Sequence, residues 1–155
     1  MINHLNKKNK PQIINISGKK ITERIAKAEA LICFKESIFK KIKTMRNKKG
    51  DIENIAILAG IMGAKDTSRI IPLCHNIPIT HINIDINQIK RSHSLKVTSV
   101  VKTNAKTGVE MEALVAVSIS CLTIYDMCKS LSKDIRIKSI KLISKSGGNS
   151  DYDLN

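Results

Sequence analysis

The most constraining feature of this sequence is a strict alternation of isoleucine with polar residues over positions 80–87. Such alternation is typical of a β-strand with one buried face. Residues 94–103 are also expected to be extended, and a short connection through 90–93 joins the two segments. Together they predict an antiparallel hairpin, to which the rest of the chain must add further strands and helices.

Helical patterns lie on both sides of this hairpin. A short amphipathic helix is predicted at 36–45, and a mostly apolar helix at 52–65 follows Asp51, which is suited to cap it. The longest apolar stripe at helical spacing covers 107–131. The chain therefore alternates between strands and helices.

Extended structure is also predicted at 12–30 and 135–144, whereas two prolines make 71–78 an irregular connection. Antiparallel strands with helices on one face predict an α+β fold, specifically a ferredoxin-like sandwich.

The length of 155 residues predicts one domain. We expect a mobile basic N-terminal arm at 1–11, a single folded domain at 12–150 and a C-terminal tail at 151–155. No apolar run approaches the roughly 18 residues of a membrane span, and no secretory signal follows the lysine-rich start. These features predict a cytoplasmic protein that does not associate with a membrane.

The chain carries 27 Lys plus Arg against 13 Asp plus Glu, a net charge of +14. Such a surplus suits nucleic acid, an anionic membrane or a phosphorylated substrate. Because Lys far outnumbers Arg and Ile and Asn are abundant, the surplus is equally typical of an AT-rich genome. Charge alone therefore does not select a ligand.

An RNA-binding alternative comes from the G-x-x-G at 60–63, the pattern of the KH loop that clamps a nucleic-acid backbone. Only 3% of the residues are aromatic, too few for a sheet that stacks bases. The pattern also lies inside a predicted helix, where small residues commonly allow close packing. We therefore expect no nucleic-acid partner.

Four cysteines, at 33, 74, 121 and 128, form no C-x-x-C pair and are expected to be reduced thiols. Cys121 and Cys128 lie seven residues apart on a predicted helix, on its packed face. A zinc site would need further ligands at suitable spacing, so no metal site is predicted.

Four segments carry more polar chemistry than packing requires: 72–75, 107–112, 125–129 and 145–148. A loop histidine can hold a phosphate or move a proton near neutral pH, and Asp next to Lys pairs an acid with a base. Ordinary interpretations remain open, among them a surface histidine, acids that favour a helix N-terminus, a surface ion pair and a flexible Gly-Gly turn.

Glu112 and Asp126 lie fourteen residues apart on one predicted helix, and therefore on nearly the same face. At the rise of an α-helix they are about 21 Å apart. One chain cannot bring both to one small substrate. If both act in one site, two subunits must form it.

The ordered motifs resemble the MoaC family of cyclic pyranopterin monophosphate synthases. The matching segments are P-L-C-H at 72–75, T-G-V-E-M-E-A-L at 107–114, L-T-I-Y-D-M-C-K at 122–129 and K-S-G-G at 145–148, with K-K-G-D at 48–51 and T-x-R at 22–24. The resemblance covers about residues 13–148. It implies a ferredoxin-like homohexamer, a trimer of dimers with sites at subunit boundaries.

The implied reaction converts the 3′,8-cyclo-7,8-dihydro derivative of GTP to cyclic pyranopterin monophosphate in molybdenum cofactor biosynthesis. Pyrophosphate leaves and a cyclic phosphate forms. Because the net change is rearrangement, cyclisation and pyrophosphate loss, no redox cofactor is expected. The resemblance also implies an upstream radical enzyme that supplies the substrate.

The resemblance assigns the catalytic acid/base to Asp126, with Lys129 as its partner. It implies substrate binding by Leu73, Cys74, His75, Met111 and Glu112, with Glu110 supporting the purine-derived end. Basic positions expected to hold the triphosphate or the leaving pyrophosphate are Lys49, Lys65 and Lys145, with Arg24 a further candidate.

The sequence departs from the family pattern at Asp66, Asn76 and Asn149, where we expect arginine, proline and a basic residue. Arg69 stands nearby where an acid is usual, so local charge is partly rearranged. These changes bear on phosphate affinity more than on Asp126 or Lys129. An inactive homologue that only scaffolds an assembly is the remaining alternative.

Overall fold

The computed structural model describes residues 4–6, 8–44 and 51–154 of the chain. Helices and strands follow one another as β1 Thr22–Cys33, α1 Glu36–Thr44, α2 Ile52–Lys65, α3 Thr67–Ile70, β2 His81–Ile89, a 3-10 turn at Lys90–Ser92, β3 Ser94–Ala105, α4 Glu110–Cys128, β4 Arg136–Ser146 and β5 Tyr152–Asp153.

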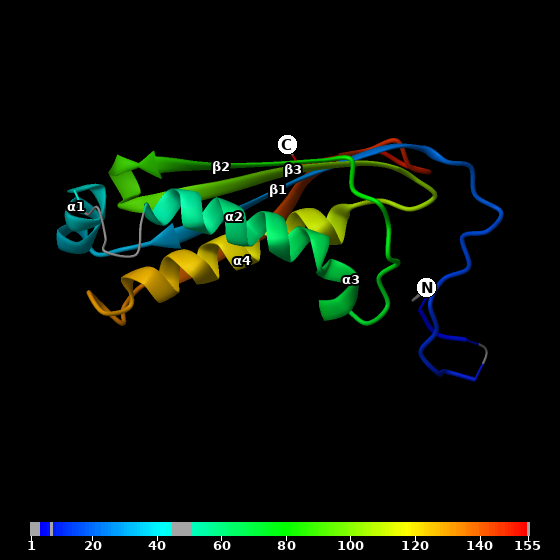
Figure 1. Cartoon of the computed structure of the whole chain (residues 1–155), viewed down its shortest axis with the longest axis horizontal. Coiled ribbons are helices and arrows are strands. Elements are labelled where there is room, and N and C mark those ends of the chain that lie inside the picture. Colours follow the sequence, from blue (N-terminus) through cyan, green and yellow to red (C-terminus); the bar gives the residue numbers. More distant parts are fainter. Residues whose placement is uncertain (1–3, 7, 45–50, 155) are drawn as a thin grey trace.

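The strands form one antiparallel sheet in the order β2-β3-β1-β4-β5. The first four strands and the helices between them follow the β-α-β-β-α-β succession of a ferredoxin-like fold. Figure 1 shows α2 and α4 side by side on one face of the sheet. The predicted α+β sandwich is confirmed.

The predicted hairpin is β2 and β3, whose nine-residue register runs from His81 opposite Lys102 to Ile89 opposite Ser94. The first strand differs from its prediction at 12–30, because β1 begins only at Thr22 and continues to Cys33. Burial explains the shift: the alternating buried side chains lie within 26–32, whereas 12–21 runs outside the sheet.

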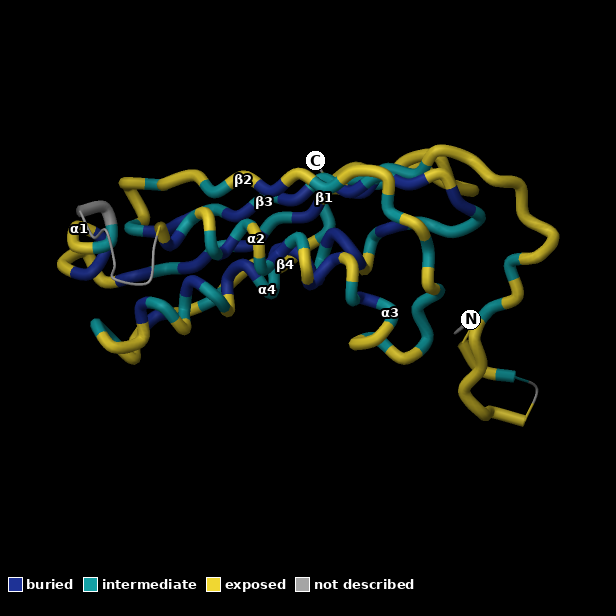
Figure 2. Tube along the Cα trace, viewed as in Figure 1, coloured by how far each residue is buried: buried dark blue, intermediate teal, exposed yellow. Residues whose placement is uncertain are grey.

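The core lies between the sheet and the two long helices, where the buried sides of the elements face one another (Figure 2). Small side chains on β1, Ala26, Ala28 and Ala30, are at most 1% exposed. They let α4 lie close over the middle of the sheet, against β1, β3 and β4.

Gly60 and Gly63 lie within α2, against α4, and not in a loop. A Cβ added at Gly60 would lie 2.2 Å from Ser120 Oγ and 2.9 Å from the Ala116 carbonyl oxygen. Ser120 also donates a hydrogen bond of 2.9 Å to the Ala56 carbonyl of α2. The KH-type interpretation of this G-x-x-G is therefore wrong, and the glycines serve helix–helix packing.

The helix α4 is long and apolar enough to cross a membrane by length and composition, although no uninterrupted apolar run predicted this. Half of its apolar window is buried, and its inner side packs against the sheet and α2. A core helix meets the same criterion. The helix therefore carries no argument for a membrane.

Cys121 and Cys128 are fully buried on the packed side of α4, as predicted. Burial raises the pKa of the Cys121 thiol to about 12 and that of Cys128 to about 11. All four cysteines are free thiols. The two helical cysteines thus act as small apolar core residues.

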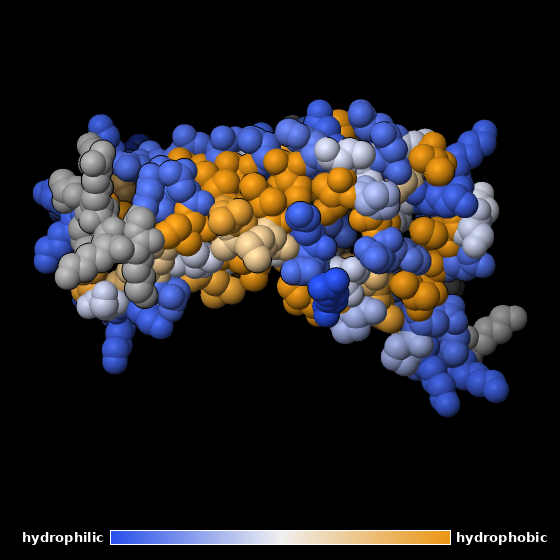
Figure 3. All heavy atoms as spheres, in the orientation of Figure 1, coloured by the Kyte–Doolittle hydropathy of each residue, from blue (hydrophilic) through white to orange (hydrophobic). Residues whose placement is uncertain are grey.

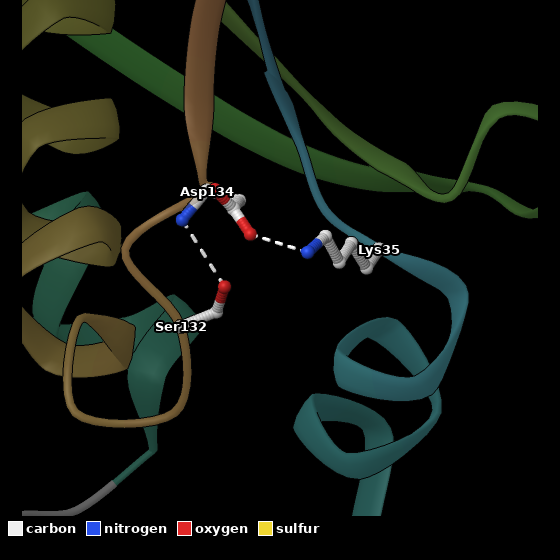
Figure 4. Close-up of polar contacts among 3 residues, drawn as sticks. All are labelled: Lys35, Ser132 and Asp134. Carbon is white, nitrogen blue, oxygen red and sulfur yellow. Dashed lines mark hydrogen bonds and ion pairs between the residues drawn. The ribbon is translucent and has the colours of Figure 1, made fainter.

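At the end of the sheet near α1, Lys35 pairs with the carboxylate of Asp134, whose backbone N–H donates 3.1 Å to Ser132 Oγ (Figure 4). Both charged side chains are more than half exposed, so this pair contributes little stability. It joins the end of β1 to the segment that enters β4. The opposite end of the sheet holds the cavities described next.

Candidate active site

Two adjoining cavities lie where β1 begins, β4 ends and α4 starts. The first, of about 200 Å³, we call the cationic chamber. Its lining comprises Lys19, Arg24, Ile25, Lys106, Thr107, Gly108, Glu110, Lys145, Ser146, Gly148, Asn149 and Ser150. Four cations and one carboxylate give this small volume a strongly positive character.

The second cavity, of about 170 Å³, we call the mixed chamber. It is lined by His4, Ile14, Ile16, Lys19, Leu73, Cys74, His75, Ile77, Thr107, Gly108, Glu110, Met111 and Glu112. Lys19, Thr107, Gly108 and Glu110 line both cavities, so the two form one continuous site. Apolar walls with a few polar groups are typical of a small-molecule site.

The site depends on four chain segments that meet at one end of the fold. The irregular 71–80 connection returns beside the start of α4, and the N-terminal segment passes the same edge (Figure 1). Thr103 of β3 donates a hydrogen bond of 2.5 Å to the Pro78 carbonyl, which fixes that connection to the sheet. Pairing of β4 with β1 places 145–148 at the same end, so that the predicted segments 72–75, 107–112 and 145–148 all contribute to the two cavities.

Glu112 is the buried acid of the mixed chamber, with only 5% of the residue exposed. Burial raises its pKa from 4.5 to about 7; a hydrogen bond from its own backbone N–H opposes the shift, and nearby Glu110 adds to it. Burial and the charge of Glu112 also raise the pKa of the Cys74 thiol. Glu112 can therefore accept or donate a proton near neutral pH.

In the cationic chamber, Lys145 pairs with Glu110 across 3.1 Å, with about a third of each side chain exposed. Lys106 donates to the Ser17 carbonyl at 2.7 Å. The Nε of Arg24 is buried with no hydrogen-bond partner among the described residues. An unpartnered guanidinium nitrogen beside a cationic cavity favours an anionic ligand.

Gly147 at the end of β4 has φ +81°, and a Cβ there would lie 1.8 Å from the Glu23 carbonyl oxygen. Glycine is therefore required at this turn. Its N–H donates a hydrogen bond of 3.1 Å to the Asp151 carboxylate. Its carbonyl accepts a hydrogen bond of 2.8 Å from the Thr22 hydroxyl. The N–H of Gly147 is thus already occupied, and Lys145 and Gly148 line the cavity instead.

Asp126 and Lys129 lie toward the other end of α4, on the side of the molecule that holds α1 (Figure 1). Lys129 Nζ is 2.6 Å from the Asp126 carboxylate, and the two side chains are 58% and 61% exposed. The hydrogen bond that Lys129 donates to the Asp126 carboxylate raises the pKa of Lys129. They line neither chamber, being about 21 Å from Glu112 along the helix.

Of the remaining basic candidates, Lys65 lies apart from the two chambers. Lys65 lines a separate open hollow of about 380 Å³ beside Ile77 and Ile79. Lys49 lies outside the described residues. Asp66 and Arg69 pair with each other across 3.5 Å, so the charge rearrangement expected at these two departures is present.

Sequence reasoning missed Lys19 and Lys106 as site residues. Both line the cationic chamber, and Lys19 lines both chambers. In a chain with 27 basic residues a single lysine carries no signal of its own. Within the described part of the chain, no group of three or more His, Cys, Asp or Glu side chains is arranged to hold a metal ion.

Comparison with known proteins matches the model of the MoaC family to residues 13–148. Cyclic pyranopterin monophosphate synthase of Helicobacter pylori strain Shi470 is 49% identical over 152 residues, covering 97% of this chain and 96% of the relative. The Campylobacter jejuni protein of the same name is 46% identical, covering 96% and 95%.

Molybdenum cofactor biosynthesis protein 1 of Drosophila melanogaster is 42% identical over 97% of this chain, which spans 27% of that longer protein. The family model matches most of the chain, and relatives 46–49% identical in sequence align over nearly the full length of both proteins. This chain belongs to the MoaC family.

Proposed function

We propose that this chain is a cyclic pyranopterin monophosphate synthase of molybdenum cofactor biosynthesis. It acts on the 3′,8-cyclo-7,8-dihydro derivative of guanosine 5′-triphosphate, forming cyclic pyranopterin monophosphate and pyrophosphate. The observation that carries the proposal is the continuous double cavity, in which a strongly cationic chamber adjoins a mixed chamber with a buried acid. The substrate is divided in the same way, into a ring system that suits the mixed chamber and an anionic phosphate tail that suits the cationic chamber.

In this proposal the mixed chamber receives the purine-derived ring. Leu73 and Met111 provide apolar contact, and His75 and Glu112 provide polar groups beside them. A carboxyl with a pKa near 7 can accept a hydrogen bond from the donor edge of a guanine-like ring, or exchange a proton with it. Cys74 forms part of the same wall.

The cationic chamber receives the phosphates. Lys145 and Arg24 supply charge-assisted donors, and Lys19 and Lys106 add to the positive field. These groups stabilise the negative charge that develops on pyrophosphate as it leaves, the usual role of Arg and Lys in phosphoryl chemistry. Lys65 and Lys49 stay predictions as further phosphate ligands.

Asp126 and Lys129 supply the catalytic acid and base from a second copy of the chain. Their exposed pair offers proton transfer within 2.6 Å, and about 21 Å of helix separates them from Glu112 of the same chain. A neighbouring subunit must therefore bring them to the chambers. We propose the homohexamer, a trimer of dimers, as the assembly in which this occurs.

An exposed apolar surface supports association between copies. Figure 3 shows hydrophobic residues gathered in the middle of the visible face, over α2 and beside the edge of the sheet. On α2 and α4, Leu58, Met62 and Leu122 are 60%, 58% and 54% exposed. Large exposed apolar patches commonly mark protein–protein contacts.

The proposed reaction needs no redox cofactor, because it rearranges, cyclises and releases pyrophosphate without net oxidation. Its substrate must come from an upstream enzyme that forms the carbon–carbon bond of the cyclo derivative, which calls for radical chemistry. We propose a cytoplasmic location, where GTP-derived substrates are made.

A turnover assay with the 3′,8-cyclo derivative tests the function, with pyrophosphate release and pterin product followed together. We expect the wild type to form both products and Asp126→Asn to lose about 10²–10⁴-fold in rate. Asp134→Asn is the matched control, since it also removes an exposed carboxylate paired with a lysine at the same end. A folded wild type that binds substrate and releases nothing would instead support the scaffold alternative.

A further inference from the structure

Glu110 is the one carboxylate among the described residues that line the cationic chamber. It lies at the junction of the two chambers, and its Oε1 is 3.1 Å from Lys145 Nζ. The resemblance to the family suggests that it supports the ring. The geometry instead directs its charge toward a lysine of the phosphate side.

Gly108 leaves the space in which this carboxylate lies. A Cβ added at Gly108 would be 2.0 Å from Glu110 Oε2 and 2.7 Å from its Cδ. The carboxylate is therefore seated against the backbone at residue 108, within the wall that both chambers share. Any larger residue at 108 would displace the carboxylate from this position.

The charges around Glu110 are unequal. Four cations line the same chamber as this one carboxylate, namely Lys19, Arg24, Lys106 and Lys145. The Arg24 Nε has no hydrogen-bond partner among the described residues. The chamber thus holds more cationic donors than its own acid can satisfy. It can accept a phosphate while Glu110 remains in place, but the carboxylate repels that phosphate.

We propose that Glu110 is the internal counterion of the cationic chamber. It holds Lys145 in place when no phosphate is bound. It also lowers the affinity of the chamber for pyrophosphate, so that this product can leave. This role rests on the proposed function, whose product includes pyrophosphate. Glu110 is then a positioning and release residue for the phosphate end, and not a recognition group for the ring.

Two other roles for Glu110 predict no change in pyrophosphate affinity. If Glu110 only favours the N-terminus of α4 through the helix dipole, its loss changes stability and leaves phosphate binding unaltered. If it accepts hydrogen bonds from the ring, its loss weakens substrate binding and leaves pyrophosphate alone. Tighter pyrophosphate binding on loss of the Glu110 charge therefore separates the counterion role from both of these roles.

The test measures binding of inorganic pyrophosphate to the full-length chain by calorimetry at low and moderate salt. We expect Glu110→Gln to lower the Kd about tenfold at low salt, equivalent to about 1.4 kcal/mol. Glu29→Gln is the matched control, because it removes the same charge from a Glu–Lys pair of 3.2 Å that lies on the sheet outside both chambers. Its Kd should stay at the wild-type value.

Unchanged or weaker binding by Glu110→Gln would overturn the proposal, and so would equal tightening in Glu29→Gln, which would reflect net charge only. During turnover, Glu110→Gln should also show inhibition by added pyrophosphate at about tenfold lower concentration. The binding measurement does not depend on turnover. If the wild type forms no product while Glu110→Gln still binds pyrophosphate more tightly, the proposed function is overturned and the counterion role stands.

Discussion

Replacing Glu112 with glutamine should make the chain more stable at alkaline pH and leave its stability nearly unchanged in acid. The carboxyl is buried in the mixed chamber, and its pKa is raised from 4.5 to about 7 in the folded chain. The unfolded chain exposes it to water and restores the ordinary value. Folding therefore favours the protonated acid.

The sign follows from proton binding in the two states. Below about pH 4.5 both states hold the proton, and Glu112 carries no penalty. Between 4.5 and about 7 the unfolded chain ionises first, so the stability contributed by this group falls as pH rises. Above 7 the penalty is complete. At about 1.4 kcal/mol per pH unit, the penalty amounts to at most about 3 kcal/mol.

Equilibrium denaturation at one fixed protein concentration measures this effect, with circular dichroism as the probe. Glu112→Gln should exceed the wild type by up to about 3 kcal/mol in free energy of unfolding at pH 8, and should match it near pH 4.5. Glu23→Gln, at an exposed position at the same end of the sheet, should show no such pH-dependent gain. A difference between Glu112→Gln and wild type that does not change with pH would refute the reasoning.

Two further predictions concern packing and phosphate binding. Gly60→Ala should lower the free energy of unfolding by about 1–3 kcal/mol despite its gain in helix propensity, because the new methyl group meets the Ala116 carbonyl of α4. Gly63→Ala, which meets only the Ile119 side chain, should cost less, and denaturant titration that ranks the two in the reverse order would contradict this packing. Asn149→Lys should tighten pyrophosphate binding several-fold and steepen its salt dependence, since residue 149 lines the cationic chamber. An unchanged Kd in calorimetry would remove residue 149 from the phosphate site.

The fold could be predicted from the sequence wherever hydrophobic period and chain breakers agreed. Alternating isoleucines marked β2, and the apolar stripe marked α4. The start of β1 could not be found in this way, because the first three buried residues of its inner face are alanines, which give a weak hydrophobic signal. The short strand β5 carries no pattern of its own and pairs with β4 through two residues.

The site could be predicted only in parts. The motifs around His75, Glu112 and Lys145 pointed to chemistry, and the fold brings them to one end of the sheet. That these motifs meet depends on tertiary packing between segments far apart in sequence. The position of Lys19 in the lining of both chambers depends on the same packing. The spacing of Glu112 and Asp126 was predictable, because one continuous helix fixes it.

The central claim is that one active site combines the chambers of one chain with the Asp126–Lys129 pair of another. Mixing inactive Glu112→Ala with inactive Asp126→Asn under subunit exchange tests it directly. With random pairing, about one quarter of the sites would receive an intact chamber and an intact pair. We predict recovery of about that fraction of turnover, and none from Glu112→Ala mixed with His75→Ala, which alter the same chamber. No recovery in the first mixture, with mixed oligomers demonstrated by mass spectrometry, would contradict the account.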